Sequence, residues 1–351
     1  MALEVNTMRI AQVAPLYESV PPKYYGGTER VVSYLTEELV RLGHDVTLYA
    51  SGDSVTKARL VSTCPHSLRL SKCLDRLSYH VVMLEQVMRD AGEFDIIHFH
   101  TDYLHFPLTR REKTRDLTTL HGRLDIPELV PLYEEFEEVP LISISDAQRL
   151  PLAWLNWKGT VHHGLPPENF RLYPKAGKYL AFLGRISPEK GPDHAIELAK
   201  QTGIPLKIAA KVDKADVEYF KEVVEPLLDS ELVEFVGEIT EREKNEFLGK
   251  AYAFLFPISW PEPFGLVMIE AMACGTPVIA YPGGSVREIV EDGLTGFVVE
   301  NGRQAVRAIS RIPTLSRPYI RQRFEKRFSA GRMASDYIAI YEELACQENA
   351  A

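Results

Sequence analysis

Short apolar runs rich in β-branched residues alternate with longer amphipathic stretches along the whole chain. Continuous apolar runs of this kind are typical of parallel strands that are buried on both faces. The stretch 29–42 places Val32, Leu35, Leu39 and Leu42 at helical spacing, which predicts a helix between two such strands. Strands that alternate with helices in this way predict an α/β fold with right-handed crossovers.

The expected strands divide equally between the two halves of the chain. Two such sets in sequence predict two doubly wound domains, each with its ligand crevice outside the carboxyl ends of its strands. The runs in the first half are Met8–Ala14, Asp45–Ala50, Asp95–Phe99, Leu117–Leu120, Val139–Ser143 and Gly159–His162. Those in the second half are Lys178–Leu183, Leu206–Ala210, Leu232–Val236, Tyr252–Phe256, Pro277–Ala280 and Gly296–Val299.

The boundary between the domains is expected in Gly164–Lys178, a stretch rich in Pro, Gly and charge without periodicity. We therefore assign residues 1–170 to the first domain and 171–328 to the second. Residues 329–351 read as one last helix, because Met333, Tyr337, Ile340, Tyr341 and Leu344 share a face.

Composition and charge exclude several classes of protein. The 351 residues include 45% hydrophobic and 25% charged side chains, which excludes disordered, collagen-like and disulfide-scaffold classes. Residues 1–170 carry 17 basic and 23 acidic side chains, a net charge of −6, and the rest carry 23 and 26, a net charge of −3. Neither half has the basic surface that duplex nucleic acid or an anionic membrane would need.

Targeting signals are not evident either. No run of about 18 apolar residues and no signal-peptide pattern is present. The four cysteines are scattered without a CxxC pair, so we expect reduced thiols in a cytoplasmic protein.

The densest chemistry lies in residues 261–277, PEPFGLVMIEAMACGTP. A turn at Gly265 opens a helix to about Ala273, and the N–H groups at the start of a helix can hold a phosphate. Glu262 and Glu270 lie eight residues apart, and carboxylates can accept hydrogen bonds from vicinal hydroxyls. Charge compensation at the helix end and a solvated carboxylate are the structural alternative.

A second segment, FLGRISPEKG, follows the first strand of the second domain. Arg185 and Lys190 in this loop could clamp a diphosphate; two ordinary surface cations in a strand–helix loop are the alternative, which the segment taken alone favours. In the first domain, Gly26 and Gly27 allow close approach of a ligand, with Thr28 as helix N-cap; a plain turn is the alternative. There is no GxGxxG fingerprint, which disfavours a nicotinamide cofactor.

Three histidines follow neighbouring strands of the first domain: His98, His100 and His121. Their spacing does not match a zinc site, and no Asp-x-Asp motif is available for a magnesium-bound diphosphate. We therefore expect no metal and no cofactor. Polar recognition of a sugar is the functional interpretation, and a buried structural side chain is the alternative for His98.

Together these segments resemble the retaining glycosyltransferase family 4. The most specific match is EPFGLVMIEAMACGTPVIA, and GRISPEKG, VEFVGEI, GGSVREIVEDGLTGFVV and the VHHG turn at 161–164 also look like that family. The resemblance implies a GT-B fold, in which two Rossmann-like domains face a central cleft and the C-terminal helix crosses back to the first domain. It also implies that the second domain binds a nucleoside-diphosphate sugar.

The resemblance assigns roles to individual residues. Glu270 would hold the ribose hydroxyls, and Glu262 would lie beside the donor sugar. The remaining assignments are Arg185 and Lys190 to the phosphates; Phe264, Gly265 and Leu266 to backbone contacts with sugar and diphosphate; Glu238 and Ile239 to the base; His121 to the donor sugar; Gly27 to the diphosphate; and His100 and Asp102 to the acceptor side. Of these, His121, Glu262, Arg185 and Lys190 form the expected catalytic set.

Two departures from the family pattern affect the prediction. Lys211 stands where the family often has a glycine, and the first domain lacks a basic membrane-docking face. We therefore expect a retaining hexosyltransferase that moves a sugar to a soluble hydroxyl acceptor. A GT-B nucleotide-sugar epimerase or hydrolase, and a non-catalytic nucleotide-sugar-binding protein, are the alternatives.

Overall fold

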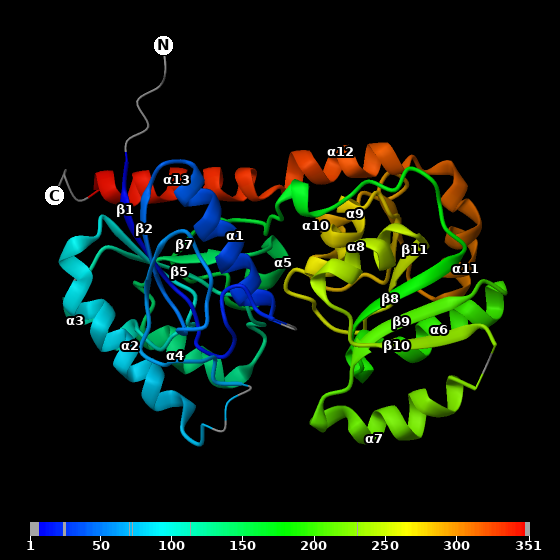
Figure 1. Ribbon diagram of the computed structural model, residues 1–351, viewed down its shortest axis with the longest axis horizontal. Coiled ribbons are helices and arrows are strands. Elements are labelled where there is room, and N and C mark those ends of the chain that lie inside the picture. Colours follow the sequence, from blue (N-terminus) through cyan, green and yellow to red (C-terminus); the bar gives the residue numbers. More distant parts are fainter. Residues whose placement is uncertain are drawn as a thin grey trace, which may run out of the picture. The chain divides into compact units, whose positions relative to one another are not determined.

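The computed structural model divides by internal contacts into two units (Figure 1). Unit 1 comprises Met1–Gly164 and Ala330–Ala351, and unit 2 comprises Leu165–Ser329. The structure describes residues 7–23, 26–69, 71, 73–112, 114–229 and 231–347. Each unit is built on its own parallel sheet.

Within the described residues, unit 1 contains a seven-stranded sheet in the order β3-β2-β1-β4-β5-β6-β7, and every pairing in it is parallel. The strands β1 and β4 lie side by side although they are not consecutive, so the strand order reverses between them. The bounds are β1 Arg9–Val13, β2 Asp45–Tyr49, β3 Arg59–Val61, β4 Ile96–Phe99, β5 Asp116–Thr119, β6 Leu141–Ser143 and β7 Trp157–Thr160.

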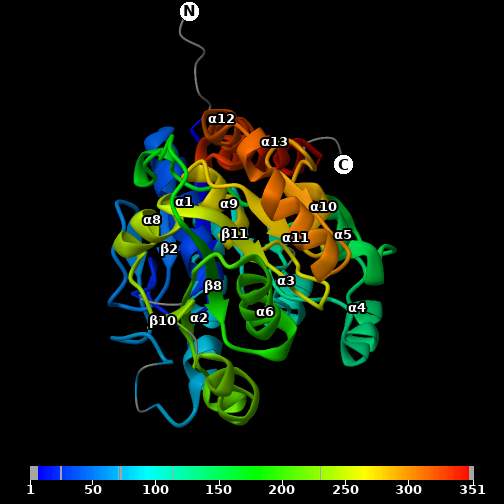
Figure 2. The same ribbon diagram turned by 90° about the vertical axis from the view of Figure 1, so that its right-hand side faces the viewer.

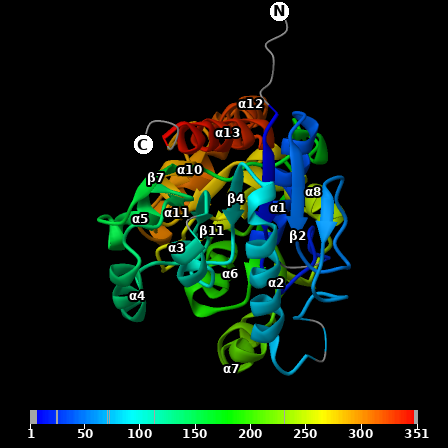
Figure 3. The same ribbon diagram turned by 90° about the vertical axis from the view of Figure 1, so that its left-hand side faces the viewer.

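Helices cover both faces of the unit 1 sheet. Side chains alternate along β1: Ala11 and Val13 join the apolar cluster that includes helix α2, whereas Gln12 bonds to Tyr341 of α13. Helix α13 also packs on α1 (Figure 3). The bounds are α1 Gly27–Arg41, α2 Arg76–Asp90, α3 Phe106–Glu112, α4 Val130–Glu135, α5 Asp146–Arg149 and α13 Ala330–Gln347.

Unit 2 contains a six-stranded parallel sheet among its described residues, in the order β10-β9-β8-β11-β12-β13. Here the order reverses between β8 and β11, the two central strands. The bounds are β8 Tyr179–Arg185, β9 Leu206–Lys211, β10 Val233–Gly237, β11 Ala251–Phe256, β12 Val278–Ala280 and β13 Gly296–Val298.

The unit 2 core includes an apolar cluster that joins the sheet to helices α6 and α11 (Figure 2). Helix α9 packs against α12, α8 and the strands β11 and β12. The bounds are α6 Pro192–Thr202, α7 Val217–Tyr219, α8 Glu241–Gly249, α9 Leu266–Ala273, α10 Val286–Ile289, α11 Gly302–Arg311 and α12 Arg317–Phe328.

All the predicted strands are confirmed, with shifted ends, and so is the last helix. The short strand β3 was not predicted, because three partly exposed residues at a sheet edge leave no readable pattern. The predicted N-cap at Thr28 is wrong: Gly26 is the N-cap of α1, and Thr28 lies inside the helix. The neighbouring Tyr24 and Tyr25 of the predicted glycine loop lie outside the described residues.

Candidate donor site

The candidate site of unit 2 lies where its strand order reverses. In open parallel sheets, ligands bind outside the carboxyl ends of the strands at this point. Arg185 is the last residue of β8 and Lys190 lies in the loop that follows, and the loop after β11 carries Glu262 and Gly265. Because β8 and β11 are hydrogen-bonded neighbours, the two predicted chemical segments emerge side by side from the sheet.

Lys190 and Glu262 form an ion pair between these two loops. The ammonium lies 4.5 Å from the ring centroid of Trp260, whose indole nitrogen donates to the same carboxylate at 2.9 Å. Both side chains are mostly buried, with 16% of Lys190 and 11% of Glu262 exposed. An ammonium group has three hydrogens, so the bond to Glu262 leaves donors for a phosphate oxygen.

Arg185 ends β8, and its guanidinium pairs with Glu189 and lies 3.6 Å from Asp216. In the sheet register it stands opposite Lys211, which is paired with Asp213 at 2.9 Å. Strand ends in this part of the sheet therefore carry cations that are balanced by nearby carboxylates. Such a group can exchange a protein carboxylate for a phosphate without burying an uncompensated charge.

Two glycines allow close packing against the loop after β11, which carries Glu262. Gly191 has a φ of +66°, and a side-chain carbon there would lie 2.3 Å from the carbonyl oxygen of Pro257. Gly284 has a φ of +55°, and its added carbon would lie 2.1 Å from the carbonyl oxygen of Glu262. Only glycine satisfies both the conformation and the space at these positions. The backbone that presents Glu262 is therefore fixed from both sides.

Helix α9 begins directly after this loop. Gly265 is its N-cap, with a φ of +78°, and Leu266 is its first residue. The carbonyl of Phe264 accepts a hydrogen bond from the Ser285 hydroxyl at 2.7 Å, which holds the approach to the helix. The backbone N–H groups of the first turn and the helix dipole can together hold an anion, as the sequence predicted.

Glu270 lies one helical turn further along α9 and is 3% exposed. It pairs with Lys244 of α8 at 3.0 Å, and Lys244 also pairs with Glu241 at 3.0 Å. The two glutamates that the sequence singled out therefore belong to separate lysine–carboxylate pairs. One pair stands at the loop before the helix, and the other stands inside the helical layer.

Glu238 and Ile239 follow the edge strand β10, with Glu238 exposed and Ile239 half-buried. One strand, β9, separates β10 from β8. At ~4.8 Å per strand, the end of β10 lies roughly 10 Å from the end of β8 across the sheet. A nucleoside with its diphosphate at β8 would span a separation of this size.

In unit 1, His100 and His121 follow neighbouring strands and are brought together. Nδ1 of His100 and Nε2 of His121 are 2.9 Å apart. Nε2 of His100 lies 2.9 Å from the side-chain oxygen of Gln12, in the middle of β1. Burial lowers the pKa of His121 to about 3 and that of His100 well below its usual range, so both rings are neutral.

Gly27 and Asp102 are not part of this network, whereas His98 lies inside β4 and is linked to it through Tyr341. Gly27 is the exposed first residue of α1. Asp102 is exposed and has a φ of +51°, a left-handed conformation that aspartate tolerates better than most residues. His98 is fully buried and bonds to Tyr341 and Thr119, each at 2.7 Å. For His98 the structure thus bears out the buried, structural alternative.

Three residues of these networks were not predicted: Lys244, Trp260 and Gln12. Trp260 stands two residues before Glu262, and Gln12 is a lone polar residue in an apolar strand, so each left a signal in the sequence. Lys244 left none, because its contact with Glu270 depends on the packing of α8 against α9.

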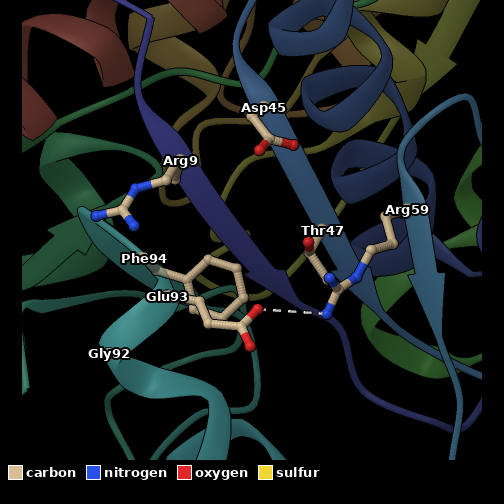
Figure 4. A pocket seen from close by; sticks show the side chains of 7 residues that line it. All are labelled: Arg9, Asp45, Thr47, Arg59, Gly92, Glu93 and Phe94. Carbon is tan, nitrogen blue, oxygen red and sulfur yellow. Dashed lines mark ion pairs between the residues drawn. The ribbon is translucent and has the colours of Figure 1, made fainter.

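A cavity of about 380 Å³ lies at the other end of the unit 1 strands, away from their carboxyl ends (Figure 4). Arg9, Asp45 and Arg59 are the first residues of their strands, so the cavity lies at the amino ends of the strands. Arg59 pairs with Glu93 at 3.5 Å. Parallel sheets rarely place ligand chemistry at this edge, and the balanced charges in this cavity give no preference for an anion.

Metal and membrane features are absent from the described residues. No group of three or more His, Cys, Asp or Glu side chains among them is arranged to hold a metal ion. In the same part of the chain, no helix combines the length and apolar character needed to cross a bilayer.

Two family models match this chain. The model described as "Glycosyl transferases group 1" matches residues 169–327, which fall in unit 2. The model described as "Glycosyltransferase Family 4" matches residues 25–160, which fall in unit 1. The matches together cover most of the chain.

Individual relatives match over nearly the full length. Phosphatidyl-myo-inositol mannosyltransferase of Mycobacterium leprae (strain TN) is 24% identical over 375 residues, covering 96% of this chain and 97% of that protein. Sucrose-phosphate synthase (tll1590) from Thermosynechococcus elongatus has a TM-score of 0.77 at 20% identity, covering 96% and 99% of the two chains. Anabaena Alr3699/HepE, in complex with UDP and glucose, has a TM-score of 0.73 at 16% identity, covering 96% and 100%.

Proposed function

We propose, from the premise that this chain belongs to the group 1, family 4 glycosyltransferases of the GT-B fold, that it is a retaining hexosyltransferase that needs no metal ion. It transfers a sugar from a nucleotide-sugar donor to an acceptor. We further propose a soluble hydroxyl compound as the acceptor, because the net charge of −6 on residues 1–170 opposes docking on anionic lipid.

One observation carries the site assignment. The cations Arg185 and Lys190, the start of α9 and Glu262 all lie at the reversal point of the unit 2 sheet. Transfer from a diphosphate donor develops negative charge on the departing phosphate. Two cations and a helix start can stabilise that charge in place of a metal ion.

The reaction proceeds by attack of the acceptor oxygen on the anomeric carbon from the face that the phosphate leaves. The carbon–phosphate oxygen bond breaks, the new glycosidic bond forms, and the departing phosphate takes the acceptor proton. Arg185 and Lys190 hold the phosphate during this step. We assign Glu262 to the sugar end of the donor, Glu270 to the ribose hydroxyls, and His121 to the sugar from unit 1.

A donor screen tests this function. The protein is incubated with a set of nucleoside-diphosphate hexoses, and free nucleoside diphosphate is measured with and without hydroxyl acceptors. Release that depends on an acceptor, with a new glycoside of retained configuration, is the expected result. Release without any acceptor would indicate a hydrolase, and binding without release would indicate a non-catalytic protein.

A further inference from the structure

A continuous line of hydrogen bonds runs through unit 1 from α13 to His121. The side-chain nitrogen of Gln12 donates to the Tyr341 hydroxyl at 3.1 Å, and its oxygen faces Nε2 of His100 at 2.9 Å. Nδ1 of His100 faces Nε2 of His121 at 2.9 Å. Gln12 and Tyr341 are completely buried and His100 is 2% exposed, so water does not compete with the bonds among these three residues, whereas the bond to His121 is only partly buried.

The direction of these bonds follows from the chemistry of the carboxamide. Its oxygen can only accept, so Nε2 of His100 carries the hydrogen that it donates to Gln12. A neutral imidazole has one N–H, so Nδ1 of His100 is bare and accepts from Nε2 of His121. By the same reasoning, Nδ1 of His121 is bare. Among the described residues, this buried nitrogen has no hydrogen-bond partner.

On the other side of the line, the amide nitrogen of Gln12 faces the Tyr341 hydroxyl at 3.1 Å and Nδ1 of His98 at 3.5 Å. The amide nitrogen donates to Tyr341, whose hydroxyl hydrogen is then directed to Nδ1 of His98 at 2.7 Å. His98 in turn donates from Nε2 to the Thr119 hydroxyl at 2.7 Å. If the amide were reversed, each N–H along the line would move to the other nitrogen. The amide of Gln12 is therefore the point that decides both directions.

We propose that Gln12, through His100, is a positioning residue that holds His121 in the tautomer whose Nδ1 accepts a hydrogen bond from a ligand hydroxyl. This rests on the proposed function, in which His121 contacts the donor sugar. It also defines the substrate class at this point: a neutral sugar with a free hydroxyl. A carboxylate or an ether oxygen has no hydrogen to donate. At this point its lone pair would face the lone pair of Nδ1, and the buried nitrogen would remain without a hydrogen bond.

The tautomer can be observed directly in the full chain, without substrate. With ¹⁵N-labelled histidine, long-range ¹H–¹⁵N correlation spectra distinguish the two tautomers, and the His121→Asn variant identifies the resonances of His121. At pH 7.5 we expect Nε2 of His121 protonated and Nδ1 bare. The opposite tautomer, or a protonated imidazolium, would overturn the proposal.

Three variants test the role of Gln12. Gln12→Met removes the amide at similar length and should give a mixture of His121 tautomers. Tyr341→Phe, which removes only the hydroxyl that bonds to the amide nitrogen, should do the same and carries the test if Gln12→Met does not fold. Ser143→Ala removes a partly buried hydrogen bond of unit 1, to Thr160, and should leave the tautomer unchanged. An unchanged His121 spectrum in both Gln12→Met and Tyr341→Phe would overturn the proposal.

The kinetic effect should pass through His121 alone. We expect Gln12→Met to lower kcat/KM for the sugar donor by about 3- to 10-fold, the worth of one neutral hydrogen bond, and to leave affinity for bare nucleoside diphosphate unchanged. In a His121→Ala background, Gln12→Met should have no further effect. Additive losses in that cycle would contradict the positioning role. Loss of the proposed function would appear instead as absent nucleotide binding in the wild type, with the tautomer result intact.

Discussion

The two units share an architecture, but the side-chain networks that we assign to ligand binding differ in charge. At the reversal point of unit 2, charged pairs such as Lys190–Glu262 occupy the strand ends. At the equivalent point of unit 1, Gln12, His100 and His121 form a line of neutral groups that bond to one another, although Glu18 and Glu29 are also buried in the segment that follows β1. The fold determines where on each sheet a ligand can bind. The side chains at that place determine whether the site suits a charged or a neutral group of the ligand.

The difference in charge between the two networks matches the different needs of a diphosphate and a sugar. A diphosphate brings charge, so its site must offer cations whose charge is balanced when the ligand is away. A sugar brings hydroxyl groups, for which correctly oriented neutral donors and acceptors are sufficient. On the proposed function, the cations of unit 2 would suit the diphosphate, and the neutral groups of unit 1 would suit the hydroxyls of the sugar.

Removing a cation from unit 2 should have the largest effect. We expect Lys190→Ala and Arg185→Ala each to lower kcat by about 10²-fold or more, because each removes a group that stabilises the departing phosphate. The matched control is Lys207→Ala, which breaks a surface pair with Glu234 in the same unit and should retain turnover. Turnover near that of the wild type in both Lys190→Ala and Arg185→Ala would remove the phosphate assignment.

The two carboxylates should separate the ribose end from the sugar end. Glu270→Gln loses a charge-assisted hydrogen bond worth roughly 1.5–3 kcal/mol, so calorimetry should show about 10- to 150-fold weaker binding of bare nucleoside diphosphate. Glu262→Gln should mainly reduce turnover, and it frees Lys190 from its carboxylate partner, so bare nucleotide should bind as well as before. Equal weakening by both changes would reverse the assignment of the two ends.

Acid should destabilise unit 1 more than unit 2. Burial lowers the pKa values of His98, His100, His105 and His163 well below the ordinary range and that of His121 to about 3. The unfolded chain binds protons at these histidines below about pH 6.5 and the folded chain does not, so stability falls as pH falls, by about 1.4 kcal/mol per pH unit for each.

Hydrogen exchange measured by mass spectrometry at pH 7.5 and 5.5, corrected for intrinsic rates, can resolve this difference between the units. Most carboxylates titrate near pH 4, below this window. In unit 1, desolvation raises the pKa of Asp102 to about 6 and that of Asp116 to about 7, so these two carboxyls bind protons in the folded chain and oppose the loss of stability, but the five histidines outnumber them. Unit 2 contains only His194 among the ten histidines of the sequence. Protection should therefore fall mainly in unit 1, and an equal or larger loss in unit 2 would contradict the account.

Chelation should have the smallest effect. We expect activity to persist in excess chelator, because Arg185, Lys190 and the start of α9 supply the positive charge that a metal ion would otherwise bring. Complete loss of activity, restored by magnesium or manganese, would show that the phosphate site needs a metal.

The sequence was most informative where a pattern is local. Buried parallel strands leave continuous apolar runs, and the turn at Gly265 before an apolar helix is readable in a single segment. The partners of the predicted residues were not readable in this way. Neither the pairing of Lys190 with Glu262, 72 residues apart, nor that of Lys244 with Glu270 follows from spacing, because both depend on which loops and helices the sheet order brings together.

A structure of the protein with bound nucleoside diphosphate tests the central claim most directly. The account predicts phosphate oxygens within hydrogen-bond distance of Lys190 Nζ and of the first backbone N–H groups of α9, with the ribose hydroxyls on Glu270. A nucleotide bound in the cavity between Arg9 and Arg59 would contradict the account. So would a nucleotide bound elsewhere while Lys190 still contacts only Glu262 and Glu270 still contacts only Lys244.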